Sequence, residues 1–104
     1  VDLAIKYITD NITQKLTIND IAKKLYVSRN HLSTTFKNET GINLIDYIAL
    51  QKIIEAKRLI RYTDKSLSEI SNYLAYSSQS YFQNQFKKIT GLTPMSYRKD
   101  RFAE

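Results

Sequence analysis

Hydrophobic positions recur along the chain in a pattern that occurs twice. Residues 17–22 align with 66–71 at an offset of 49 (17 to 66), and Leu25 falls on Leu74 at the same offset. After the following turn the offset is 50 (28 to 78). The residues that match there are Ser28, Leu32, Phe36, Lys37, Thr40, Gly41 and Tyr47 with Ser78, Phe82, Phe86, Lys87, Thr90, Gly91 and Tyr97. The sequence therefore contains two copies of one unit, and the second has one extra residue in its turn.

Each copy begins with a short helix. Ser66 and Glu69 form a capping box, in which the hydroxyl and the carboxylate each accept a free backbone N–H. Thr17 and Asp20 are a shorter version of the same device. An i, i+4 spacing then predicts one buried face on each helix, made by Ile21 with Leu25 and by Ile70 with Leu74.

A second helix follows a short turn in each copy. Ser28 is a suitable N-cap for the first of these helices, and either Ser77 or Ser78 is suitable for the other. Gly41 and Gly91 lie where a left-handed residue would end them. Each copy is thus predicted to be a helix, a turn and a second helix.

Three further segments complete the prediction of seven helices and no strand, an all-α fold. Residues 2–11 predict an opening helix, and Thr93-Pro94 begins a last one, with proline at the first helical position. Residues 43–62 predict a long connecting helix with a hydrophobic stripe of Ile45, Ile48, Ala49, Ile53, Ala56, Leu59 and Ile60. We expect a single domain, 1–104, with a first subdomain (1–41), a linker helix (42–62) and a second subdomain (63–104).

The second helix of each copy has a polar face. At about 100° per residue, Leu32 and Phe36 turn one side of the first such helix inward, and Phe82 and Phe86 do the same in the other. The residues on the outward side and its flanks are short amides, hydroxyls and cations. They are Arg29, Asn30, Ser33, Thr34 and Lys37, and then Gln79, Ser80, Gln83, Asn84 and Lys87.

Such a face suits the DNA major groove, which the second helix of a helix-turn-helix enters while the first helix braces it. Amides can bond adenine edges, and hydroxyls can approach a base or a phosphate. We expect Asn30, Ser33, Thr34, Gln79, Ser80, Gln83 and Asn84 to read bases. We expect Arg29, Lys37, Lys87 and Lys88 to meet phosphates, although Arg29 could do either. The alternative is an ordinary solvated helix face.

Positive charge is concentrated in two windows. The formal net charge is +6, and the stretches 21–38 and 70–99 contain four cations each and no acid. These stretches carry +8, so the rest of the chain carries 6 − 8 = −2. Two separate basic windows are the pattern expected of two surfaces that meet phosphates.

Two reading helices in one chain predict a geometry on DNA. Successive major grooves on one face of a duplex lie about 34 Å apart. A connecting helix of about 20 residues spans about 30 Å at 1.5 Å per residue. A monomer could therefore read a bipartite site that lacks two-fold symmetry.

These residues resemble the signature of the AraC/XylS family of transcription regulators. The resemblance is carried by the run 70–82, by Phe86-Lys87-Lys88, by residues 91–94 and by Tyr97-Arg98. Phe36-Lys37, Gly41 and the linker run 57–60 fit the same pattern.

The resemblance implies two helix-turn-helix subdomains joined by a long helix, and regulation of transcription, usually activation. The family's base-contacting positions fall on Asn30, Ser33, Thr34, Ser80, Gln83 and Asn84. RNA polymerase is then a further candidate partner. Relatives commonly have glycine where Ala75 stands, so we expect a less relaxed turn there.

An enzyme, a metal site and a bound cofactor are not expected. His31 is the one histidine and there is no cysteine, so a zinc site lacks ligands; we expect His31 at the edge of a core. Gly41 and Gly91 are isolated and form no phosphate-binding loop. Most tyrosines are expected to pack in or beside the cores, among them Tyr47, Tyr73, Tyr76 and Tyr97.

The rival reading is a helical module that binds a protein partner or coats nucleic acid without sequence preference. An exposed apolar groove, or affinity that follows salt but not sequence, would favour it. The chain begins with Val1, so we expect a piece of a longer protein whose sensing or dimerising part lies elsewhere. The sequence has no signal peptide and no apolar run long enough to span a membrane, so a cytoplasmic location in a bacterium is expected. The expected partner is double-stranded DNA, and no membrane contact is expected. We expect the isolated domain to be monomeric; the full-length protein could dimerise through a domain that lies elsewhere.

Overall fold

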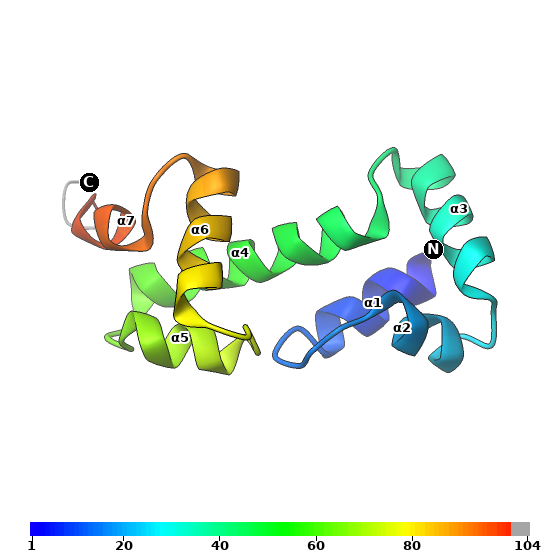
Figure 1. Cartoon of the computed structure of the whole chain (residues 1–104), viewed down its shortest axis with the longest axis horizontal. Helices are drawn as coiled ribbons and strands as arrows, with labels where there is room; N and C mark the ends of the chain where they lie inside the picture. The colour runs from blue at the N-terminus through cyan, green and yellow to red at the C-terminus, as the bar shows by residue number, and fades with distance from the viewer. Residues whose placement is uncertain (101–104) are drawn as a thin grey trace. The chain divides into compact units, whose positions relative to one another are not determined.

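The structure, a computed structural model, describes residues 1–100, and all their regular secondary structure is helical (Figure 1). The helices are α1 (Asp2–Asp10), α2 (Ile18–Lys24), α3 (Arg29–Thr40), α4 (Leu44–Tyr62), α5 (Leu67–Tyr73), α6 (Gln79–Thr90) and α7 (Pro94–Asp100). The predicted all-α class and the order of the seven helices are confirmed. The last four residues of the predicted second subdomain, 101–104, lie outside the described residues.

The chain folds as two compact units, Val1–Gln51 and a second that begins at Lys52, so the division falls inside α4. Each unit has its own hydrophobic core. In the first core Leu44 and Ile48 of α4 join buried residues of α1, α2 and α3. In the second core the later part of α4 packs with α5 and α6. The residues that α4 gives to the second core are Ile53, Ala56, Leu59 and Ile60.

The hydrophobic stripe predicted for α4 is wrong at one position. Ile45 is 60% exposed, whereas Leu44 and Ile48 are buried. Residues four apart lie on the same side of a helix, and Ile45 is turned about 100° away from Leu44. The buried side of α4 therefore begins at Leu44, one residue earlier than the sequence pattern indicated.

The first helix of each helix-turn-helix begins at the predicted cap. The hydroxyl of Ser66 accepts the N–H of Glu69 at 3.0 Å, and the Glu69 carboxylate accepts the N–H of Ser66 at 3.0 Å. This backbone hydrogen bond lowers the pKa of Glu69. In the first unit Thr17 Oγ1 accepts the N–H of Asp20 at 3.1 Å. Both α2 and α5 are thereby started by side chains that satisfy otherwise free backbone donors.

The turn after α2 places a large side chain in the left-handed region. Tyr26 has φ 58°. Its N–H donates to the carbonyl of Lys23 at 3.2 Å, and the N–H of Val27 donates to the carbonyl of Ala22 at 3.0 Å. These are the two hydrogen bonds of a Schellman motif, in which the left-handed residue is usually glycine.

The turn after α5 repeats this geometry. Ala75, which matches Tyr26 at the offset of 49 (26 to 75), has φ 61°. Its hydrogen bonds also match, from the Ala75 N–H to the Asn72 carbonyl and from the Tyr76 N–H to the Ser71 carbonyl, each at 3.0 Å. A residue with a Cβ in this region is strained by about 1–2 kcal/mol, which agrees with the less relaxed turn expected at Ala75.

Lys52 ties α4 to this second turn. Its side chain is 8% exposed, and Nζ donates to the carbonyl of Leu74, the C-cap residue of α5, at 2.6 Å. Burial disfavours the charged ammonium and lowers the pKa of Lys52 from 10.5 to about 8. A buried ammonium within the hydrophobic stripe of α4 is thus hydrogen-bonded to the end of α5.

Replacing Ala75 with glycine should raise the free energy of unfolding by about 0.5–1 kcal/mol. Relief of the left-handed strain exceeds the extra backbone entropy that glycine loses on folding. Urea denaturation of the two proteins at equal pH measures the difference. A glycine variant less stable than the parent would show that the Ala75 methyl contributes more by packing than it costs by strain.

Lys52 should also make stability depend on pH. Between about 8 and 10.5 the unfolded chain binds more protons at this lysine than the folded chain does. The free energy of unfolding should therefore rise with pH across that window, by about 1–3 kcal/mol, while the full penalty of burying the charge remains below pH 8.

Lys52→Met is the reference protein. Other groups titrate in the same pH range, and their contribution to the pH dependence of stability is present in both proteins. Urea denaturation at a series of pH values should show the parent gaining stability relative to Lys52→Met between pH 8 and 10.5. Parallel pH profiles for the two proteins would contradict the prediction.

Candidate nucleic-acid interface

α3 is held to the first unit by two side chains one turn apart. Leu32 and Phe36 are buried, and the Phe36 ring meets Tyr47 edge-on, with centroids 5.2 Å apart. The helix starts at Ser28, whose Oγ accepts the N–H of His31 at 3.0 Å. It ends at Gly41 with φ 79°, as predicted. These contacts determine which side of α3 is directed outward.

α6 is held in the second unit in the same way. Phe82 and Phe86 are buried, and Phe86 packs edge-on against Tyr97 at 5.7 Å, the counterpart of the Phe36–Tyr47 pair. The cap is Ser78, whose Oγ accepts the N–H of Tyr81 at 3.0 Å. Of the two serines considered, Ser78 is thus the one that starts the helix. Gly91 ends it with φ 85°.

The outward faces of α3 and α6 have the same pattern of exposure. Residue by residue, 29–37 and 79–87 show the same order of exposed, half-buried and buried positions. The exposed members of the predicted set are Arg29, Asn30, Thr34, Lys37, Gln79, Ser80, Asn84, Lys87 and Lys88, and the half-buried ones are Ser33 and Gln83. In each unit one helix therefore presents these short polar groups together on a single face.

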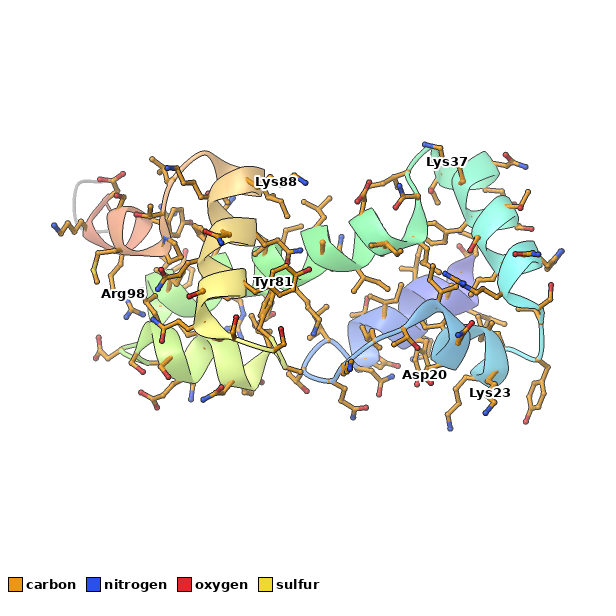
Figure 2. The ribbon with its side chains drawn as sticks, in the orientation of Figure 1. Asp20, Lys23, Lys37, Tyr81, Lys88 and Arg98 are labelled. Carbon is orange, nitrogen blue, oxygen red and sulfur yellow. The ribbon has the colours of Figure 1, made fainter. Side chains whose placement is uncertain are left out.

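The cations are not all equally available. Lys87 and Lys88 are exposed near the end of α6, and Figure 2 shows Lys88 directed away from the helix. Lys37 lies at the end of α3, where its Nζ donates to the carbonyl of Gly41 at 3.1 Å (Figure 2). Arg98 of α7 is half-buried. α6 contains no acidic residue, and its two cations, Lys87 and Lys88, lie in its last turn.

His31 is not at a core edge, so that prediction was wrong. It is exposed, because Leu32 takes the core position and its neighbour is turned about 100° away. His31 matches Tyr81 at the offset of 50, and Tyr81 is also exposed. Both residues therefore lie in the first turn of the second helix of a helix-turn-helix, beside the predicted set. The repeat itself could have identified this pair.

Tyr81 is braced within the second unit. Its ring lies 5.8 Å from that of Tyr76, edge-on, and its hydroxyl accepts from Nε2 of Gln85 at 3.4 Å. Tyr76 in turn donates its hydroxyl to Oε1 of Gln85 at 2.6 Å, and burial raises the pKa of Tyr76. The start of α6 is thus packed against Tyr76 in the preceding turn.

The other tyrosines behave largely as expected. Tyr47, Tyr76 and Tyr97 are partly buried against the two cores. Tyr73 is more exposed than predicted, at 46%, and Nζ of Lys65 lies 5.7 Å from its ring centroid. Packing against the two cores accounts for the first three.

Among residues 1–100, the histidine, aspartate and glutamate side chains form no group of three or more that could hold a metal ion. Within the same residues, no helix has both the length and the apolar character needed to cross a bilayer.

The chain matches the family model of a helix-turn-helix domain over residues 21–100. It is similar to the bifunctional transcriptional activator/DNA repair enzyme AdaA of Bacillus subtilis, with 36% identity over 99 residues that cover 95% of this chain and 47% of AdaA. The chain thus spans about half the length of that relative.

Solved structures share the fold. The C-terminal domain of AraT, a response regulator from Geobacillus stearothermophilus, has a TM-score of 0.90 and 34% identity, covering 92% of this chain and 80% of that one. A transcriptional regulator from Chromobacterium violaceum, described as containing an AraC-type DNA-binding domain, has a TM-score of 0.88 and 28% identity, with coverage of 96% and 89%.

Proposed function

This chain belongs to the AraC-type family of helix-turn-helix DNA-binding domains, and we propose that it reads a double-stranded DNA sequence with both of its units and thereby regulates bacterial transcription. The observation that carries the proposal is the matched exposure of α3 and α6. Each helix buries one hydrophobic side and presents amides, hydroxyls and cations on the other. Such a face combines groups that bond base edges with groups that bond phosphates.

We assign the roles within each face by chemistry. The amides and hydroxyls read bases, and the cations hold the duplex backbone. The base-reading residues are Asn30, Ser33, Thr34, Gln79, Ser80, Gln83 and Asn84. The phosphate contacts are Arg29, Lys37, Lys87 and Lys88. The Lys37 ammonium must leave the Gly41 carbonyl to reach a phosphate, so we expect it to contribute less than Lys87.

The two units are proposed to enter successive major grooves of one duplex. In this proposal residues 1–41 and 63–104 are the two reading subdomains and 42–62 is the linker. The 19 residues of α4 correspond to about 28 Å at 1.5 Å per residue, close to the groove spacing of about 34 Å. A single chain would then recognise a two-part site without needing a symmetric partner.

The chain's wider role is also part of the proposal. We infer that it carries no catalysis of its own, although its relative AdaA is named as a repair enzyme as well as an activator. The AdaA name also favours activation, for which RNA polymerase is the natural partner. We propose that the isolated domain is monomeric, that any dimer forms through another part of the whole protein, and that it works in the cytoplasm, where bacterial DNA lies.

Selection of duplexes from a randomised pool tests the proposal. Enrichment of a motif in two parts, about one helical turn apart, is the expected result. No enrichment together with steep salt dependence would point to non-specific coating of nucleic acid. No binding to any duplex would favour the helical module that binds a protein partner.

Asn84→Ala should weaken binding to the selected duplex about 5- to 100-fold and leave binding to random duplexes nearly unchanged. A bidentate amide–adenine pair discriminates by about 1–3 kcal/mol, and removal of the amide loses only that sequence-dependent part. Fluorescence anisotropy with both duplexes measures the two affinities. Asn72→Ala, an exposed amide on α5, is the matched control. Equal losses on both duplexes would remove Asn84 from the base-reading set.

Lys87→Ala should weaken all duplexes alike. It should also lower the slope of log affinity against log salt by about one unit, because one fewer counterion is released from the DNA. The control is Lys15→Ala, which removes the same charge from an exposed position between α1 and α2, before the first helix-turn-helix motif begins. An unchanged slope for Lys87→Ala would place that lysine off the DNA backbone.

A further inference from the structure

Tyr26 stands out as an exposed aromatic residue in a strained backbone conformation. It has φ 58° in the turn between α2 and α3, and 94% of its surface is exposed. Glycine would adopt this conformation freely, and large side chains rarely do. With so little of the ring covered, packing inside the unit does not offset the strain.

The second unit shows that the turn itself does not require a ring. Ala75 holds the same place with φ 61° and the same pair of backbone hydrogen bonds. At the left-handed residue the two turns therefore share their backbone geometry and differ in side chain, although the second turn is one residue longer. A strained residue that the fold does not need is a reasonable indicator of a functional contact.

The surroundings of Tyr26 are basic. Lys23 and Lys24 occupy the last turn of α2 and Arg29 opens α3, and all three are exposed. Figure 2 shows Lys23 at the end of α2, directed into solvent. No acidic residue occurs between Asp20 and Glu39. A basic setting of this kind favours a polyanionic partner over a neutral or basic one.

The position of the turn in a helix-turn-helix identifies the part of the polyanion. The first helix crosses the DNA backbone, and the N-terminal residues of the second helix meet the base edges. The turn that joins them passes between these two places, at the rim of the major groove.

We propose that Tyr26 is a DNA-contacting residue specific to the first unit. Its ring packs against a deoxyribose at the groove rim, and its hydroxyl donates to a phosphate oxygen of the same strand. Tyrosine hydroxyls are among the groups that make such positioning contacts. The proposal rests on the DNA-binding function proposed above and adds a contact outside the polar faces of α3 and α6.

Tyr26→Gly and Ala75→Gly form a matched pair for the test. Both remove the left-handed strain, but only the first removes a ring. Anisotropy with the selected duplex should show about a three- to tenfold loss of affinity for Tyr26→Gly, the effect of one or two modest contacts, although its midpoint of urea denaturation rises. For Ala75→Gly the midpoint of urea denaturation should also rise, but the affinity for the selected duplex should not change. A purely structural role for Tyr26 would not separate stability from affinity in this way.

Tyr26→Phe isolates the hydroxyl. It keeps the ring and should lose about two- to fivefold in affinity, with the slope against salt unchanged because no charge is removed. Replacing single phosphates at the rim by neutral methylphosphonates should locate the partner. At one phosphate position, the methylphosphonate should weaken DNA binding by the parent more than it weakens DNA binding by Tyr26→Phe.

Affinity of Tyr26→Gly equal to or above that of the parent overturns the inference. If that variant binds DNA normally and instead loses activation in a purified transcription reaction, the ring faces a protein, and the inference is overturned as well. A parent chain that binds no duplex would contradict the proposed function itself, so the two failures are distinguishable.

Discussion

The arrangement of each unit depends on the burial of two large hydrophobic side chains one turn apart on its second helix. Leu32 and Phe36 do this in α3, and Phe82 and Phe86 in α6. Because a helix is rigid, two anchors on one side determine where every other side chain of that helix is directed. The polar residues face outward as a set for this reason. Their own hydrogen bonds contribute little to that orientation.

The two units bury these anchoring side chains in cores of different composition. The second has a chain of rings from Tyr76 through Phe82 and Phe86 to Tyr97, with centroids 5.1–6.0 Å apart. In the first, a single ring pair is joined by aliphatic side chains from α1 and α2. Edge-to-face rings stabilise a packed cluster beyond the area they bury. α3 and α6 thus present the same pattern of exposure although the two cores differ in composition.

α4 has a second structural role besides joining the units. Its first part completes one core and its later part completes the other, with Lys52 at the start of the second unit. The buried Lys52 ammonium holds the carbonyl at the end of α5, directly before the strained turn that leads into α6. A displacement of α4 would therefore act on that turn through a short, buried hydrogen bond.

The amino-acid sequence alone determined the number and order of the helices, their serine and threonine caps, the left-handed glycines, the repeat and the outward polar faces. Each of these follows from local chemistry or from spacing within one helix, and both can be read along the chain. The tertiary structure decided what depends on contacts between helices. It buried Lys52, left Ile45 and His31 exposed, and placed Tyr26 in the left-handed region. In those places the packing of neighbouring helices outweighs the preference of the single residue, so hydropathy and spacing could not predict the outcome.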